Sequence, residues 1–476
     1  MEFRVMDNPD TEKVQEELTP NWEELFDHLQ RVMSSGTEVM QLKATLKLAR
    51  LSNLAPEDLL ADTIPILARL LGDIDVSGSL TCSIQQAAAY CLKQIASRGE
   101  GRLATKIGQS GVIQSVLRLL PQSDDTFQRI LVKCLRNIVT FANVNRVIVA
   151  RNGGLEVVIG TLNSCNDGTR RYLLEILSAL TLLREVRRVL ICLGGLRFLV
   201  EAARFGSMVS RERACQAIGL LGITRRARRM LVELGVIPVL VELFHVGDST
   251  TKLVAGNSLG VISAHVDYIR PVAEAGAIPL YAELLQGPDP NGKEIAEDVF
   301  CILAVAEMNA VAIAEHLVRI LREGNVEAKA AAADVLWDLS SYKHSVPVVR
   351  NSGAIPILVN LMSDENDEVR EKVSGAIAQL SYNEADRIAL ADAGAVPIMI
   401  ELLQCESEEV KDNAAESLIN FSEDPLQHER ISEAIGIPSF QSMQNRMIRL
   451  RASDDLMVRS MRRMSIEQLT WDPDLV

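Results

Sequence analysis

Short apolar stretches recur along the chain at a nearly constant spacing, and the clearest ones open with Gly-x-x-Pro. The strongest copies begin at Gly235, Gly276, Gly353 and Gly394, and the interval within the first pair equals the interval within the second. Weaker copies begin at Gly111, Gly154 and Gly195, and one without glycine begins at Ala312. A period of roughly 40 residues in a helical pattern predicts an all-α array in which each unit buries its apolar face against its neighbours.

Each part of the repeated unit has a physical interpretation. Glycine can adopt the left-handed conformation that ends one helix, and proline fits the first turn of the next, so Gly-x-x-Pro predicts a corner between two helices. An apolar stripe follows, then a polar break such as 363–367, then a longer helix with one buried face, as at Val373, Ala376, Ile377 and Leu380. A short helix, such as 386–392, precedes each corner. The unit therefore contains three helices.

This three-helix unit resembles the armadillo repeat family, clearly over residues 98–436 and, through a degenerate copy at 62–71, somewhat further towards the start. The resemblance implies a right-handed α-solenoid superhelix of about nine three-helix armadillo repeats. It is of the non-importin type and is similar to plant armadillo-repeat proteins. Some of those carry a U-box or a BTB domain, and we expect neither here.

The pattern also divides the chain into regions. We expect a disordered acidic N-terminus at 1–19, a helical cap at 20–61, the armadillo array at 62–436, and a partial repeat, capping helix and tail at 437–476. One unit is short, because Ala312 follows Gly276 at a smaller interval than separates the other copies. We expect that unit to have lost most of its first helix, near 307–311, and to kink the superhelix.

Composition agrees with a packed helical array and limits the location of the protein. Hydrophobic residues make up 48% and aromatic residues 4%. No apolar run approaches the roughly 20 residues of a membrane helix, and the start lacks the pattern of a signal peptide, so we expect a cytoplasmic or nuclear protein. The eight cysteines form no CxxC pair, which predicts buried reduced thiols rather than disulfides or metal ligands.

Charge is segregated along the chain far more than the net charge of −14 suggests. Residues 102–230 hold 21 Lys and Arg against 8 Asp and Glu, a balance of +13, whereas residues 231–440 hold 13 against 34, a balance of −21. For any single charge a solvated outer face is the simpler interpretation. Segregation over whole repeats indicates surfaces that select charged partners.

The armadillo resemblance implies that the long third helices line a groove that holds an extended peptide. Importin-α-like members grip basic peptides with a Trp, and an Asn four residues later, on each such helix. On this chain only Asn137 and Asn420 match the Asn position, no Trp matches, and Tyr90 takes the first Trp position. Trp337 falls three residues off its position and is expected in the core. A nuclear transport receptor is therefore the alternative hypothesis, not the favoured one.

The same mapping, extended by one more helical turn, predicts what this groove would bind. Candidate groove residues are basic in the first repeats and acidic at the far end: Arg129, Lys133, Asn137, Arg171, Asn257, Asp298, Asp334, Asp338, Glu416 and Asn420. A partner segment with acidic residues at one end, an apolar middle and basic residues at the other would complement them. Ion pairs between neighbouring repeats are an equally weighted alternative.

Two arginine-rich runs occupy equivalent places at the short first helices of adjacent repeats and are expected to stack on one edge. They comprise Arg184, Arg187, Arg188, Arg225, Arg226, Arg228 and Arg229. An acidic partner, a phospholipid surface or nucleic acid could bind such an edge. Interleaved aromatic residues are missing, which favours a solvated edge over nucleic-acid binding.

Catalytic motifs fail on inspection. Residues 287–293 have the G-x4-G-K spacing of a phosphate-binding loop, but Glu294 replaces the required Ser or Thr. We expect no enzyme, cofactor or metal site, and instead a protein-binding scaffold or adaptor. Ser465 follows two arginines and is a candidate phosphorylation site. The partner and the oligomeric state stay open.

Overall fold

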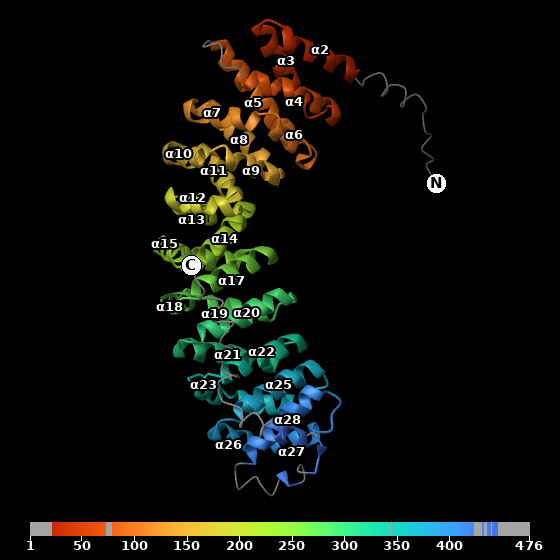
Figure 1. Cartoon of the computed structure of the whole chain (residues 1–476), viewed down its shortest axis with the longest axis vertical. Helices are drawn as coiled ribbons and strands as arrows, with labels where there is room; N and C mark the ends of the chain where they lie inside the picture. The colour runs from red at the N-terminus through yellow and green to blue at the C-terminus, as the bar shows by residue number, and fades with distance from the viewer. Residues whose placement is uncertain are drawn as a thin grey trace, which may run out of the picture. The chain divides into compact units, whose positions relative to one another are not determined.

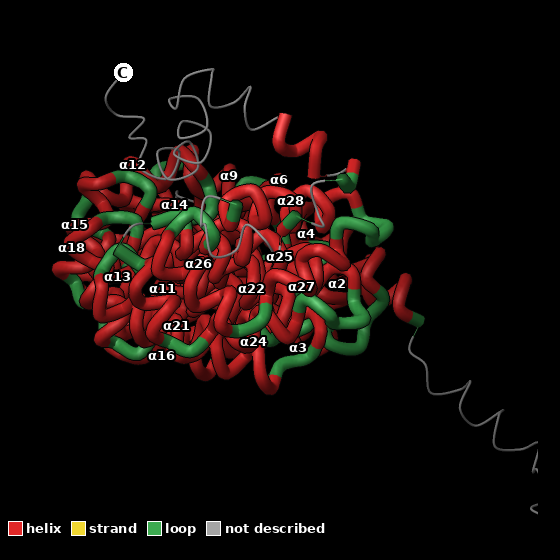
Figure 2. Tube along the Cα trace, turned by 90° about the horizontal axis from the view of Figure 1, so that it is seen from below, coloured by secondary structure: helices red, strands yellow, loops and turns green. Residues whose placement is uncertain are grey.

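The computed structural model describes residues 21–72, 79–342, 344–422, 431–432, 436–438 and 440–445. These residues form helices joined by short loops, without a strand among them (Figures 1 and 2). Contacts divide the chain into two compact units, Met1–Ala217 and Ile218–Val476, and each is described by itself. No helix in the described ranges combines the length and the hydropathy needed to cross a membrane.

The first unit opens with two 14-residue helices and continues with units whose long helices pack side by side. Its α-helices are α2 (Trp22–Ser35), α3 (Glu38–Leu51), α4 (Glu57–Gly72), α5 (Ser79–Ala96), α6 (Ala104–Gln109), α7 (Val112–Leu119), α8 (Asp125–Phe141), α9 (Asn143–Arg151), α10 (Gly154–Ser164), α11 (Asp167–Leu180), α12 (Arg184–Cys192), α13 (Leu196–Phe205) and α14 (Met208–Gly222), which runs across the unit boundary. The long helix α8 contacts α5 on one side and α11 on the other.

The second unit repeats the same three-helix pattern. Its helices are α15 (Arg225–Glu233), α16 (Val236–Val246), α17 (Ser249–Ser263), α18 (Val266–Glu274), α19 (Ala277–Leu285), α20 (Pro290–Leu303), α21 (Glu307–Glu323), α22 (Val326–Ser340), α23 (Val346–Asn351), α24 (Ala354–Leu361), α25 (Asp367–Leu380), α26 (Glu384–Asp392), α27 (Ala395–Leu402) and α28 (Glu408–Phe421). The long helices α17, α20, α22, α25 and α28 contact one another in that order.

The predicted corners between helices are present in the copies that contain glycine. Gly353 has φ 80° and immediately precedes α24, whose third residue is proline. In two weaker copies the left-handed residue is the first glycine of a Gly-Gly pair: Gly153 (φ 71°) and Gly194 (φ 66°), not Gly154 and Gly195. This moves the register to the preceding residue in each copy and makes the interval from Gly153 to Gly194 equal to the interval from Gly194 to Gly235.

Where the glycine is missing, the corner is missing too. Helix α4 runs through Pro65, so the predicted boundary between cap and array at 61/62 lies inside one helix. Residues 307–311 are not lost; they form the start of α21, which is continuous to Glu323. Without a residue that readily takes positive φ, the two short helices join into one.

Burial agrees with most of the core predictions. The helix face predicted to be buried is at most 1% exposed at each of its four residues, Val373, Ala376, Ile377 and Leu380. Cys91, Cys134 and Cys215 are buried as well, and burial raises the pKa of the Cys134 thiol to about 12. Two cysteines, Cys82 and Cys192, are exposed, so the prediction of buried thiols was wrong for them. The predicted N-terminal disorder at 1–19, nearly all of the 437–476 region and Ser465 lie outside the described residues.

Candidate functional site

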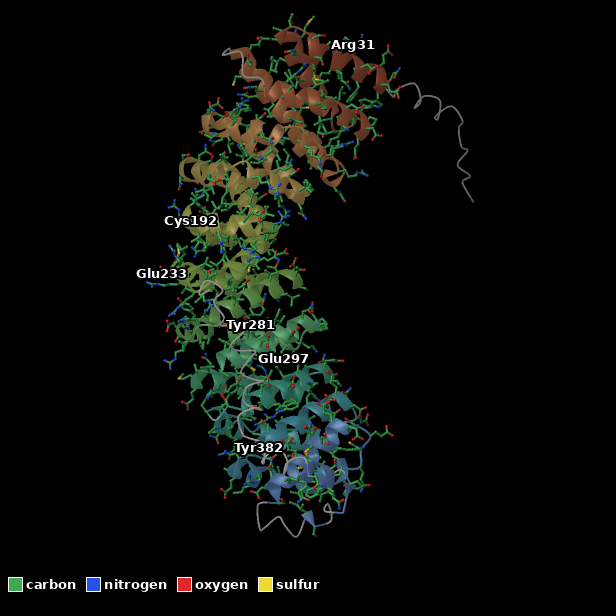
Figure 3. The ribbon with its side chains drawn as sticks, viewed as in Figure 1. Arg31, Cys192, Glu233, Tyr281, Glu297 and Tyr382 are labelled. Carbon is green, nitrogen blue, oxygen red and sulfur yellow. The ribbon has the colours of Figure 1, made fainter. Side chains whose placement is uncertain are left out.

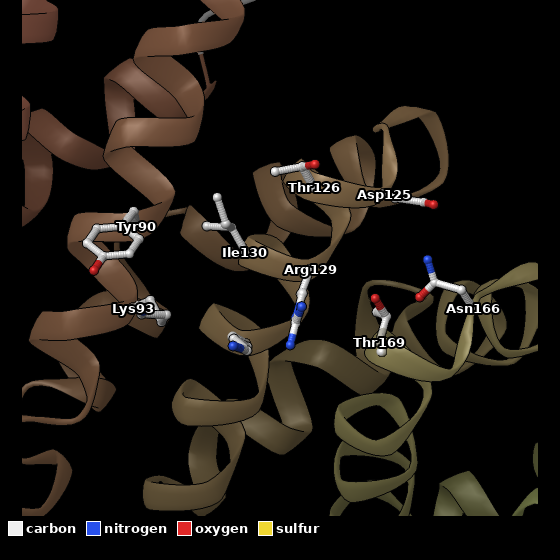
Figure 4. Close-up of a pocket in the computed structure, with 10 residues that line it drawn as sticks. Tyr90, Lys93, Asp125, Thr126, Arg129, Ile130, Asn166 and Thr169 are labelled. Atoms are coloured by element: carbon white, nitrogen blue, oxygen red, sulfur yellow. The ribbon is translucent and has the colours of Figure 1, made fainter.

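A cavity of about 700 Å³ opens between α5, α8 and the amino end of α11 in the first unit. Figure 4 shows Tyr90 and Lys93 on one helix and Ile130 and Arg129 on the next. Thr169 lies on a third helix, α11, and Asn166 is the residue that precedes that helix. The complete lining is Tyr90, Lys93, Asp125, Thr126, Arg129, Ile130, Lys133, Asn166, Gly168 and Thr169. Two of the predicted groove residues, Arg129 and Lys133, therefore meet in one place.

Tyrosine rings support the cations around this cavity. Lys93 Nζ lies 4.0 Å from the centre of the Tyr90 ring, and Lys133 Nζ lies 5.0 Å from that of Tyr172. The Arg171 guanidinium also lies 5.0 Å from the centre of the Tyr172 ring. Arg171, a predicted groove residue, therefore belongs to the same cluster. Such cation–π contacts hold cationic heads in place without neutralising their charge.

The positive charges in this cluster shift the pKa values of neighbouring side chains. Burial, followed by repulsion from Lys133, lowers the pKa of Lys93. Burial alone would raise the pKa of Tyr172, but Lys133 and Arg171 outweigh it and lower that pKa. Across the described part of the chain, the recorded ion pairs include none made by Lys93, Arg129, Lys133 or Arg171. The cavity thus concentrates positive charge.

Asn137 and Asn420 have a different role from the one predicted for them. Asn137 is 8% exposed and donates its amide to Lys93 O over 3.0 Å. Asn420 is 2% exposed and donates to Ser381 Oγ over 2.9 Å. Each amide is bound to the long helix of the preceding repeat or to the residue that follows it. We therefore remove both asparagines from the candidate binding surface.

In the second unit, carboxylates of α20 and α22 gather around one lysine of α25. Lys372 Nζ is 3.3 Å from Asp334 Oδ1, and the thiol of Cys301 donates to Asp338 Oδ2 over 3.7 Å. Burial, then the charge of Asp334, raises the pKa of Glu297 to about 7. Figure 3 labels Glu297 at this place. The acidic cluster therefore comprises Glu297, Asp298, Asp334 and Asp338.

The acidic cluster contains some of the predicted groove residues, whereas other predicted groove residues lie elsewhere in the second unit. Burial and Glu294 raise the pKa of Asp298. Glu416 lies further along, on α28, and accepts a hydrogen bond of 2.5 Å from Tyr382 Oη. Asn257 is exposed on α17. The ion pair between Asp334 and Lys372 is of the kind that the alternative interpretation anticipated, a pair between long helices of neighbouring repeats.

The two arginine-rich runs fall in different units, so their predicted stacking on one edge stays a prediction. Within each run one arginine is structural: Arg187 donates to Leu182 O over 3.2 Å and Arg228 to Gly222 O over 2.7 Å. Arg228 is only 5% exposed. These two side chains satisfy carbonyls at or just after the end of the preceding long helix, so their guanidinium groups already have structural partners.

The rest of the arginine runs is exposed or paired. Arg184, Arg188, Arg225 and Arg226 are exposed. Arg229 is also exposed and pairs with Glu233 of its own helix over 2.9 Å. A hollow of about 410 Å³ beside α15 is lined by three of the arginines together with the acids Glu233 and Asp267. Mixed charge makes this hollow a weaker anion site than the cavity of the first unit.

Several residues of these clusters escaped the sequence mapping. They are Lys93, Tyr172, Glu297 and Lys372, which lie one or three residues from the positions that the importin-type Trp would take at Tyr90, Glu175, Asp298 and Gly375. Considering every partly exposed residue of these helices, rather than the mapped positions alone, would have found them.

Comparisons with known proteins agree with this architecture. A family model for HEAT repeats matches residues 314–419. An engineered protein of known structure is 22% identical over 84% of this chain and 99% of its own, with a TM-score of 0.61. A chain from a structure entitled "A conserved phosphorylation switch controls the interaction between cadherin and beta-catenin in vitro and in vivo" is 17% identical over 90% of this chain and 88% of its own, with a TM-score of 0.65.

The chain has an α-solenoid fold. A computationally designed armadillo repeat protein for modular peptide recognition is also similar, at 21% identity over 47% of this chain and 99% of its own, but its TM-score of 0.38 adds no argument. No curated protein matches the sequence significantly. At these identities the solved structures establish the fold of the solenoid. Its binding properties rest on the sites themselves.

Proposed function

We propose that this solenoid is a non-enzymatic scaffold that binds an acidic, extended segment of a partner protein in the α5–α8–α11 cavity. The observation that carries the proposal is the meeting of Lys93, Arg129 and Lys133 in one cavity, where Asp125 is the only carboxylate among the described lining residues. Cations that neighbouring acids do not neutralise attract an anionic partner and fix its register.

The acidic cluster of the second unit supports a second binding site, for a basic segment. Glu297, Asp298, Asp334 and Asp338 outnumber the single cation Lys372, so a lysine or arginine of a partner would reduce their mutual repulsion. Cytoplasmic or nuclear localisation stays a prediction, and a transport receptor that carries cargo in place of a scaffold is the alternative function.

The first site can be tested by photocrosslinking. Ile130 lines the cavity and is half-buried, so a photoreactive amino acid placed there would attach to whatever segment occupies the site in cells. Mass spectrometry would then identify the attached residue in the partner. We expect acidic segments to be recovered, and to be lost when Lys133→Glu and Arg129→Glu reverse the charge of the site.

Arg151→Glu is the matched control, because Arg151 is exposed on α9 and does not line the cavity. It should leave crosslinking unchanged. Crosslinks to neutral or basic segments, or acidic crosslinks that survive the reversal at both cavity positions, would refute the proposed site. Circular dichroism of each variant would establish that loss of binding is not loss of folding.

A further inference from the structure

We infer that the α5–α8–α11 cavity recognises a phosphorylated serine or threonine within the partner's acidic segment. This inference rests on the proposed function and specifies its ligand. Its basis is the charge balance of the lining: Lys93, Arg129 and Lys133 are cationic and Asp125 is anionic, which leaves about two positive charges. One carboxylate would neutralise half of that excess. A phosphate monoester, with a charge near −2 at neutral pH, would neutralise nearly all of it.

The donors in the cavity also suit a phosphate. Two ammonium groups and one guanidinium supply many N–H donors for the three acceptor oxygens of a phosphoryl group. Thr126 and Thr169 are also among the lining residues. The first turn of the 14-residue helix α11 contributes Gly168 and Thr169 to the lining, so the partial positive charge of a helix amino end adds to the side-chain charges.

The aromatic residues favour a phosphopeptide over nucleic acid. Proteins that bind single strands need open aromatic faces on which bases can stack. Here a lysine lies over the Tyr90 ring, at 4.0 Å, and another lysine and an arginine lie near the Tyr172 ring, each at 5.0 Å. The cavity lies between helices and, at about 700 Å³, is large enough for a side chain.

The test uses the full-length protein and oriented peptide libraries with a fixed central residue in an Asp- and Glu-rich context. Three libraries are compared, with phosphoserine, glutamate or serine at the centre. We expect phosphoserine to bind about tenfold more tightly than glutamate, since it makes more charge-assisted hydrogen bonds. Lys133→Gln and Arg129→Gln should each reduce phosphoserine binding to near the glutamate level. Lys106→Gln and Arg151→Gln, at exposed positions outside the cavity, should leave it unchanged.

The failures of the two proposals are distinguishable. Equal binding of the phosphoserine and glutamate libraries, both sensitive to Lys133→Gln, would overturn the phosphate inference and leave the acidic-segment scaffold standing. Absence of binding by every acidic library would overturn both. Binding of vesicles that contain phosphoinositides, or of single-stranded RNA, with the same dependence on Lys133 and tighter than the phosphoserine library, would assign the site to those ligands and overturn the inference.

Discussion

The indole ring of Trp337 on α22 lies against Gly375 on α25, so close that a Cβ built on Gly375 would be 2.4 Å from Trp337 Cζ3. Trp337 is half-buried, so it is less enclosed than the core position predicted for it. The glycine allows two long helices of the second unit to approach closely, and this contact lies beside the acidic cluster, since Asp334 and Asp338 flank Trp337 in sequence.

We therefore expect Gly375→Ala to destabilise the protein by about 1–3 kcal/mol, because the new methyl group must displace the indole ring. Chemical denaturation monitored by tryptophan fluorescence would measure it. Gly160→Ala on α10 is the matched control: its Cβ would meet nothing within 4 Å, and it should be neutral or stabilise by up to about 1 kcal/mol. Similar effects of the two substitutions on stability would show that the Trp337 ring can move to admit the methyl group at little energetic cost.

Arg228→Ala should destabilise the second unit by about 1–3 kcal/mol, because it leaves carbonyls of Gly222 and Ile223 without the guanidinium that now satisfies them. Arg226→Ala, at an exposed position of the same helix, should change stability by less than about 0.5 kcal/mol. Thermal unfolding of the two variants side by side gives the comparison. An equal response would mean that Arg228 belongs to a surface edge after all.

Asp386→Ala should be among the more damaging single substitutions, at about 3 kcal/mol or more. Asp386 is fully buried and forms an ion pair with Arg350 across the short helices α23 and α26. Removing the carboxylate leaves the half-buried guanidinium with Asn383 as its recorded acceptor. Asp392→Ala, at the exposed end of α26, is the control and should be nearly neutral. Urea denaturation midpoints of the two variants would measure the difference in stability. A small loss of stability in Asp386→Ala would show that solvent reaches the Arg350 guanidinium.

Glu297 predicts a dependence of stability on pH. Burial first, and the neighbouring carboxylates next, raise its pKa from 4.5 to about 7 in the folded protein. The folded state therefore binds this proton more tightly than the unfolded state, so the contribution of Glu297 to stability is full below pH 4.5 and is lost as the pH rises towards 7. Above that pH the folded protein must hold the charged form among other anions.

Glu297→Gln should accordingly stabilise the protein at pH 8, by about 1–3 kcal/mol, and have little effect at pH 4.5. Comparing free energies of unfolding at the two pH values isolates this residue from the other titrating groups. Glu283→Gln, at an exposed position of α19, should show no such difference. If Glu297→Gln stabilised the protein equally at both pH values, the effect would come from packing and not from ionisation.

Much of the fold could be predicted because the residues that end one helix and begin the next are close together in the sequence. A left-handed glycine followed by proline specifies a corner within a few residues, as at Gly353, and the absence of glycine explains why α4 and α21 are continuous. Pairs such as Gly153-Gly154 are ambiguous in register, because either glycine can take positive φ; the structure selects the first.

The candidate sites could be predicted only in part. The sequence by itself determined the period, the helical class and the segregation of charge, since each depends on residue types and spacing along one chain. Only the tertiary structure decided which charges serve binding and which serve packing. Lys93 and Lys133 converge on one cavity, Asp334 meets Lys372, and Arg228 turns inward to carbonyls. The two lysines belong to different long helices, α5 and α8, and Asp334 and Lys372 likewise belong to α22 and α25. Helix packing between repeats therefore sets the distances within both pairs and their exposure to water.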